Sequence, residues 1–140
     1  MITYVDTSSL LKLLIEEDGS DRAALIWDTA DSLASASLVV VEGRAALAAA
    51  ERGERLTRSQ HRTAKRELMA LVDELTIVEV TEDLVAAAAD LAEVEALRGY
   101  DAVHLAAALT VDATILTSAD SVLCAAAERQ GLHVANPVGP

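Results

Sequence analysis

A chain of 140 residues fits the usual size of one domain, and at 52% hydrophobic it is too apolar for an intrinsically disordered protein. Its formal net charge of −12 argues against a general nucleic-acid coat protein, because non-specific binding needs phosphates neutralised by Lys and Arg. No stretch approaches the roughly 20 apolar residues of a membrane-spanning helix and no basic leader opens the sequence, so we expect one cytoplasmic domain over residues 1–140 without membrane contact.

The first half of the chain predicts two strands and four helices. Residues 1–5 are β-branched and aromatic and stop at Asp6, which opens a run of side chains that cap helices. Ser37 is a candidate helix cap, and Thr57 followed by Gln60 has the form of a capping box. The expected strands span 1–5 and 33–36, and the expected helices span 10–15, 21–30, 38–52 and 58–74.

The second half continues this alternation. Thr81 with two acids after it marks a helix start, whereas Arg98 and Gly99 interrupt the helical pattern. The expected strands span 76–80, 113–116 and 132–135, and the expected helices span 81–97, 100–110 and 119–129, before a short tail at 136–140. Strands that alternate with helices predict an α/β fold whose parallel sheet is covered on both faces.

Two acidic residues lie at the predicted carboxyl ends of strands. Asp6 directly follows the first strand, and Asp120 lies just after the fourth. Ligands of open α/β sheets bind at these strand ends, near the point where the strand order reverses. Taken singly, each residue is also explained as a helix cap or a first-turn acid.

Glu42 is a carboxylate on an otherwise apolar helix face. Its neighbours three and four positions away are Leu38, Val39, Ala45 and Ala46. A buried charge there costs several kcal/mol unless it is paired or bound to a metal. A local pair with Arg44 is the alternative, but positions two apart on a helix do not face each other.

Asp101 opens a segment that is apolar except for His104. Asp101 has an alternative interpretation as an ordinary acid of a first helical turn. His104 shares the Asp101 face and could orient its carboxylate, but a lone histidine on an apolar face is more often a core residue, so we do not predict it as a ligand.

Four acids from separate elements can meet only if a cation offsets their repulsion. Mg²⁺ and Mn²⁺ prefer oxygen ligands, and such a site activates water and stabilises the charge that develops during phosphodiester cleavage. The sequence offers no His and Cys set for zinc, no P-loop and no glycine-rich dinucleotide motif. A dehalogenase-like phosphatase would need an acid where Ser8 stands, and a receiver domain would need a lysine later than Lys65.

Four segments together resemble PIN-domain ribonucleases and, among these, VapC-type toxins. They are YVDTSSLL at 4–11, the helical Glu42, LRGYDAVHLAAA at 97–108, and ILTSAD at 115–120. The resemblance implies a three-layer α/β/α PIN-like domain with a five-stranded parallel sheet. It also implies an endoribonuclease that depends on Mg²⁺ or Mn²⁺ and cleaves RNA with metal-activated water, a cognate VapB-type antitoxin, and a homodimer.

Carried onto this chain, the resemblance assigns the catalytic and metal-binding positions to Asp6, Glu42, Asp101 and Asp120. Ser118 stands where the family often has Thr and keeps the hydroxyl that hydrogen-bonds in the site. A second hypothesis is a catalytically inactive PIN-like module that binds RNA or a protein, but such a module should have lost one or more of the four carboxylates.

Six of the eleven basic residues form one basic stretch: Arg52, Arg55, Arg58, Arg62, Lys65 and Arg66. In proteins of the resembled family this region borders the active-site groove, so these side chains could bind RNA phosphates. The alternative is a solvated face on which Glu51, Glu54 and Glu67 pair with them locally.

Overall fold

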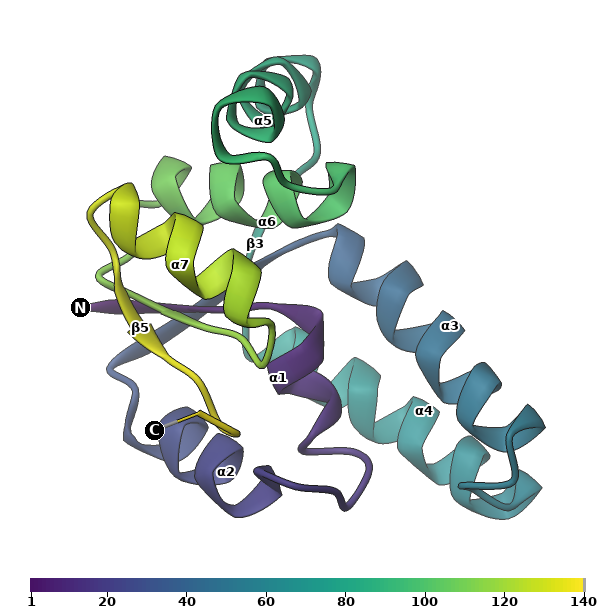
Figure 1. The fold of residues 1–140 in the computed structure, drawn as a ribbon. Helices are drawn as coiled ribbons and strands as arrows, with labels where there is room; N and C mark the ends of the chain where they lie inside the picture. Colours follow the sequence, from purple (N-terminus) through teal and green to yellow (C-terminus); the bar gives the residue numbers. More distant parts are fainter. Residues whose placement is uncertain (140) are drawn as a thin grey trace.

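The five strands form one parallel sheet in the computed structural model, which describes residues 1–139 (Figure 1). Pro140, the last residue of the expected tail, lies outside the described residues. The strand order is β3-β2-β1-β4-β5, and every neighbouring pair is parallel. The strands are β1 (Ile2–Val5), β2 (Ser32–Ala36), β3 (Thr76–Val78), β4 (Ile115–Thr117) and β5 (His133–Ala135).

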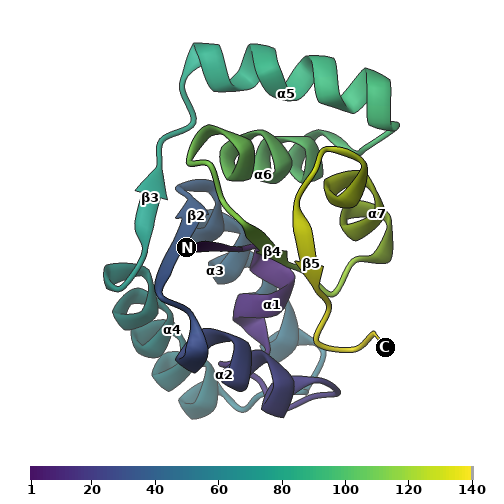
Figure 2. The same cartoon turned by 90° about the vertical axis from the view of Figure 1, so that its left-hand side faces the viewer.

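Seven helices surround this sheet in the described part of the chain, which confirms the predicted α/β fold. They are α1 (Thr7–Leu11), α2 (Ser20–Thr29), α3 (Leu38–Arg52), α4 (Arg58–Asp73), α5 (Glu82–Glu95), α6 (Gly99–Thr110) and α7 (Ser121–Arg129). Figures 1 and 2 show α5, α6 and α7 on one face of the sheet and α1 to α4 on the other, so the molecule has three layers.

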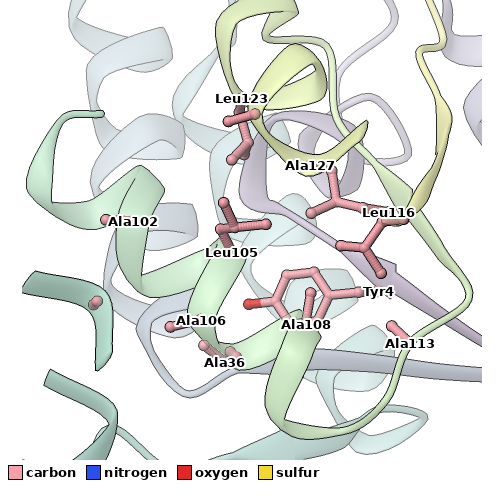
Figure 3. Packing of buried hydrophobic residues seen from close by; sticks show 14 of the residues in the cluster. Tyr4, Ala36, Ala102, Leu105, Ala106, Ala108, Ala113, Leu116, Leu123 and Ala127 are labelled. Atoms are coloured by element: carbon pink, nitrogen blue, oxygen red, sulfur yellow. The ribbon is translucent and has the colours of Figure 1, made fainter. Parts of the chain in front are cut away.

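Two apolar cores lie on the two faces of the sheet. One packs α5, α6 and α7 against the sheet around Tyr4 and Leu116, which are fully buried. Figure 3 shows Leu105 and Leu123 gathered with them, together with small alanine side chains that let α6 approach the sheet closely. The other core contains Val39, Leu47 and Leu68, among others, and joins α3 to α4. Leucine and alanine build most of this packing, as the lack of Phe requires.

The predicted bounds of the five strands agree with the structure within two residues, and two other local predictions differ from it. The first helix was expected through residue 15, but α1 ends at Leu11 and the backbone continues in tighter turns, in which Leu13 and Leu14 donate to carbonyls three residues back. Ser37 makes no capping hydrogen bond with its side chain and has helical backbone angles. Its N–H donates to the carbonyl of Val78 at 3.0 Å, which extends the β2–β3 pairing to the helix start. The capping box of Thr57 and Gln60 is confirmed.

Across residues 1–139, none of the helices has both the length and the apolar character needed to cross a bilayer.

Candidate metal centre

A cleft of about 370 Å³ opens at the carboxyl ends of β1 and β4. The chain leaves β1 toward β2 on one side of the sheet and returns at β4 on the other, so this is where the strand order reverses. All four predicted acids line this carboxylate cleft: Asp6, Glu42, Asp101 and Asp120. They come from the end of β1, from α3, from the first turn of α6 and from the start of α7.

Asp6 is a buried carboxylate, only 4% exposed, held by neutral donors. Its Oδ1 accepts from the Ser8 hydroxyl at 2.7 Å and from the Ser9 N–H at 3.1 Å, so Asp6 is also the cap of α1. Its Oδ2 accepts from the Ser118 hydroxyl at 2.7 Å. Burial raises the pKa of Asp6 above its usual value, and the positive potential of His104 and the hydrogen bonds only partly oppose this.

Ser118 links the ends of the two central strands from a fully buried position behind Asp6. Its hydroxyl donates to Asp6 and accepts from the Asp120 N–H at 3.0 Å. Ser8 makes a second link of the same kind, since it donates to Asp6 and accepts from the Ala119 N–H at 2.9 Å. The two hydroxyls therefore fix the segment that carries Asp120 relative to the carboxylate of Asp6.

Glu42 faces the cleft because of how α3 packs against α4. The neighbouring Gly43 lies so close to Leu68 that a Cβ there would be 3.0 Å from the nearest leucine methyl carbon. The missing side chain lets this face of α3 pack tightly on α4, and the tight contact limits rotation of α3 about its own axis. Glu42 Oε1 accepts from Thr7 Oγ1 at 2.7 Å and from His104 Nε2 at 2.6 Å. Burial tends to raise its pKa, but these two hydrogen bonds prevail, so the pKa of Glu42 lies below its usual value.

Asp101 and Asp120 share one arginine. Arg98 Nε lies 3.1 Å from Asp101 Oδ2, and Arg98 Nη2 lies 3.2 Å from Asp120 Oδ2. Burial raises the pKa of Asp101, and the guanidinium of Arg98 partly opposes this rise. Asp120 Oδ1 accepts from the N–H groups of Val122 and Leu123, so Asp120 caps α7. Each of these acids therefore has both roles: it stands at the start of a helix and also lines the cleft, as Asp6, Asp101 and Asp120 do.

The donor chemistry of the cleft fits a hard divalent cation. Its acidic groups offer carboxylate oxygens, the ligands that Mg²⁺ and Mn²⁺ prefer. Asp6 also favours a bound cation, because this carboxylate is almost fully buried and its hydrogen-bond donors are all uncharged. Within residues 1–139 no three His, Cys, Asp or Glu side chains already converge as a ligand group, since Glu42 is bound by His104 while Asp101 and Asp120 are both bound by Arg98.

Sequence reasoning missed several residues of the cleft. His104 was considered as a partner of Asp101, but it bonds Glu42 instead, and its Nδ1 lies 2.7 Å from the Tyr4 hydroxyl. The sequence pattern around Arg98 indicates only a break between two predicted helices. Thr7 and Ser8 lie in the capping run after the first strand, and that concentration of hydroxyls next to Asp6 was the available signal. Nothing in the sequence indicated the role of Arg98.

The basic stretch occupies the end of α3, the connecting turn and α4 (Figure 1), and none of its residues lines the carboxylate cleft. Among the described residues, Arg55 is the member of the stretch that forms an ion pair, with Glu17 at 3.5 Å, whereas Glu51 is hydrogen-bonded to His61 at 2.9 Å. The local pairs with Glu51, Glu54 and Glu67, which the alternative interpretation requires of the basic stretch, are not formed among the described residues. Arg55 is the member of the stretch that lines a neighbouring cleft.

Comparisons with known proteins show the family and the fold of this chain. The PIN domain family model matches residues 3–129. Ribonuclease VapC45 from Mycobacterium tuberculosis is 44% identical over 110 residues, which cover 79% of this chain and 76% of the relative. The structure of FitAcB from Neisseria gonorrhoeae is similar with a TM-score of 0.74 at 18% identity, and the match covers 98% of each chain. That of VapBC2 from Rickettsia felis, bound to a promoter DNA fragment, has a TM-score of 0.66 at 15% identity and covers 97% of this chain and 98% of the other. The two structural likenesses show the fold.

Proposed function

Since the chain belongs to the PIN domain family and is a ribonuclease of the VapC toxin type, we propose that its carboxylate cleft is the catalytic centre of a Mg²⁺- or Mn²⁺-dependent endoribonuclease. The observation that carries the proposal is that four carboxylates from four separate elements line a single cleft at the switch point of the sheet. We assign metal binding to Asp6, Glu42, Asp101 and Asp120, with Ser118 as their support. Residues 1–140 form one PIN domain in this proposal.

A divalent cation in the cleft would lower the pKa of a coordinated water and stabilise the charge that develops on a phosphodiester. The protein's own side chains orient the carboxylates that would hold the cation. The hydroxyls of Ser8 and Ser118 hold both oxygens of Asp6. His104 and Thr7 hold Oε1 of Glu42, whose Oε2 has no hydrogen-bond partner among the described residues. Arg98 is 65% exposed at the rim, where its remaining N–H groups can donate to a phosphate oxygen of the RNA.

We further propose the partners that the relatives suggest. VapBC2 and the toxin-antitoxin complex from Klebsiella pneumoniae, both similar in fold, are toxin–antitoxin assemblies, which supports a cognate VapB-type antitoxin for this chain. A homodimer is the proposed oligomer, and exposed apolar side chains such as Val85 and Val94 on α5 are compatible with one. A nuclease of cellular RNA must share its compartment, so we assign the cytoplasm. Co-purification with the product of the adjacent reading frame tests the antitoxin assignment.

Cleavage of labelled RNA by the purified protein tests the proposed activity. We expect cleavage with Mg²⁺ or Mn²⁺, none in excess chelator, and recovery when the metal is restored. Asp6→Asn should abolish cleavage. Asp83→Asn is the matched control, because Asp83 is also an acid at a helix start but lies on α5, outside the cleft. Cleavage that persists in chelator and in Asp6→Asn contradicts the proposal, and RNA binding without cleavage by the wild type favours the inactive module.

A further inference from the structure

A second cleft, of about 450 Å³, adjoins the carboxylate cleft and carries the opposite charge. We call it the flanking cleft. It shares Ser8, Leu11 and Ala46 with the carboxylate cleft, so the two clefts are neighbours. Its remaining lining residues are Lys12, Ile15, Glu17, Ala49, Ala50, Arg55 and Ala119. On α3 the two clefts meet at Ala46, which is half-buried.

Lys12 is the unusual residue of the flanking cleft, since it is a lysine that is only 9% exposed. Its Nζ lies 3.0 Å from Glu17 Oε1, its hydrogen-bond partner in the described part of the chain. An ammonium group has three N–H donors, so two of them remain for a ligand. Arg55 Nη2 lies 3.5 Å from the other oxygen of the same carboxylate. Two cations therefore share one carboxylate, which leaves one positive charge in excess beside the acidic centre.

The flanking cleft lies along α3 next to the carboxylate cleft, which gives an RNA strand bound at the carboxylates room to continue. Glu42 and Ala50 are eight residues apart on α3, which corresponds to roughly 12 Å at 1.5 Å per residue. Lys12 and Arg55 line the flanking cleft and not the carboxylate cleft, and both pair with Glu17, so they do not occupy the four carboxylates. Because RNA is the polyanion of the proposed reaction, a net positive cleft there offsets the repulsion that a strongly acidic protein exerts on its substrate.

We propose that Lys12 and Arg55 form a binding subsite for an RNA backbone phosphate that flanks the cleavage position, with Glu17 as the internal counter-charge that the phosphate displaces. This inference rests on the proposed function, because it takes RNA as the ligand. It narrows the role of the basic stretch to Arg55, and it assigns a role to Lys12, which lies outside that stretch. The competing interpretation is a purely structural ion-pair network that ties the segment after α1 to the α3–α4 turn.

Binding of a fluorescein-labelled single-stranded RNA, measured by anisotropy in chelator over a series of salt concentrations, tests the proposal. Lys12→Met and Arg55→Gln should each weaken binding several-fold and flatten the slope of log affinity against log salt by about 0.7, the value for one lost phosphate contact on a single strand. Glu17→Gln should strengthen binding, because it releases both cations. Arg62→Gln is the control, since Arg62 is exposed on α4 and lines neither cleft.

The direction of the Glu17→Gln effect separates the two interpretations. A structural network predicts a lower melting temperature for all three variants and no change in affinity or in the salt slope, and that result would overturn the subsite. If Lys12→Met does not fold, the exposed Arg55 and the Glu17→Gln variant still decide the matter. The proposed catalytic function fails in a different way, with RNA bound by the wild type but left uncut when Mn²⁺ is added.

Discussion

His104 Nε2 lies 2.6 Å from Glu42 Oε1, although 62 residues separate the two in the sequence. A carboxylate only accepts, so Nε2 carries a hydrogen in this contact, while Nδ1 lies 2.7 Å from the Tyr4 hydroxyl. The buried ring therefore connects the first strand to the carboxylate of α3 and sets the direction in which Glu42 points.

His104→Ala should lower both Mn²⁺ affinity and cleavage by about 10- to 100-fold, the usual effect of losing a residue that orients a metal ligand. His104→Gln should keep most of both, because a glutamine amide can donate to Glu42 from a similar position. Calorimetric Mn²⁺ titration, at a temperature where both variants are folded, measures the difference. Equal losses in the two variants would mean that the ring matters for packing and not for orienting Glu42.

Arg98→Gln should raise Mn²⁺ affinity several-fold, because the guanidinium is a cation that already occupies Asp101 and Asp120. Arg129→Gln serves as the control, since Arg129 pairs with Glu95 outside the cleft. Titration calorimetry of both variants at equal ionic strength checks this. A weaker affinity in Arg98→Gln would contradict competition and indicate that Arg98 holds the two carboxylates in place.

Asp6→Asn should make the metal-free protein more stable at neutral pH. Burial raises the folded-state pKa of Asp6 above the unfolded value of about 3.9, so the folded state binds this proton more tightly. The stability that Asp6 contributes is full below the unfolded pKa and is lost as pH rises through the folded pKa. The gain from the amide should therefore shrink on acidification. Urea unfolding in chelator at several pH values measures it, and a less stable variant at neutral pH would contradict the assignment.

Leu105→Ala should lower the free energy of unfolding by about 2–5 kcal/mol, the usual cost of a cavity in a closed core. Leu105 is fully buried on α6 and lies with Leu116 and Leu123 around the Tyr4 ring (Figure 3). Val94→Ala is the control, because Val94 is 75% exposed on α5 and its truncation leaves no internal cavity. Denaturant unfolding compares the two, and a similar small cost for both would contradict this account of the core.

Local patterns predicted the succession of strands and helices along the chain and the placement of Asp6 and Asp120 at strand ends. Both depend on neighbours within a few residues. The short α1 was not predictable in this way. The segment after α1 is held by Ser20, the first residue of α2. The Ser20 hydroxyl donates to the carbonyl of Ile15 and accepts from the N–H of Glu17.

The partners of the site residues depend on contacts distant in sequence. Helix periodicity placed His104 on the face of Asp101, but the sheet brings Tyr4 and Glu42 to the two ring nitrogens. Arg98 bridges Asp101 and Asp120 only because α6 and α7 begin beside each other at the same edge of the sheet. Such contacts follow from the assembled fold and not from local spacing.

The claim that the four carboxylates form one cation site is tested most directly by calorimetric titration of metal-free protein with Mn²⁺. The wild type and Asp83→Asn should bind Mn²⁺ with the same affinity, whereas Asp6→Asn should bind it far more weakly, since Asp83 lies outside the cleft and Asp6 is its buried carboxylate. Unchanged Mn²⁺ affinity in Asp6→Asn would contradict the account.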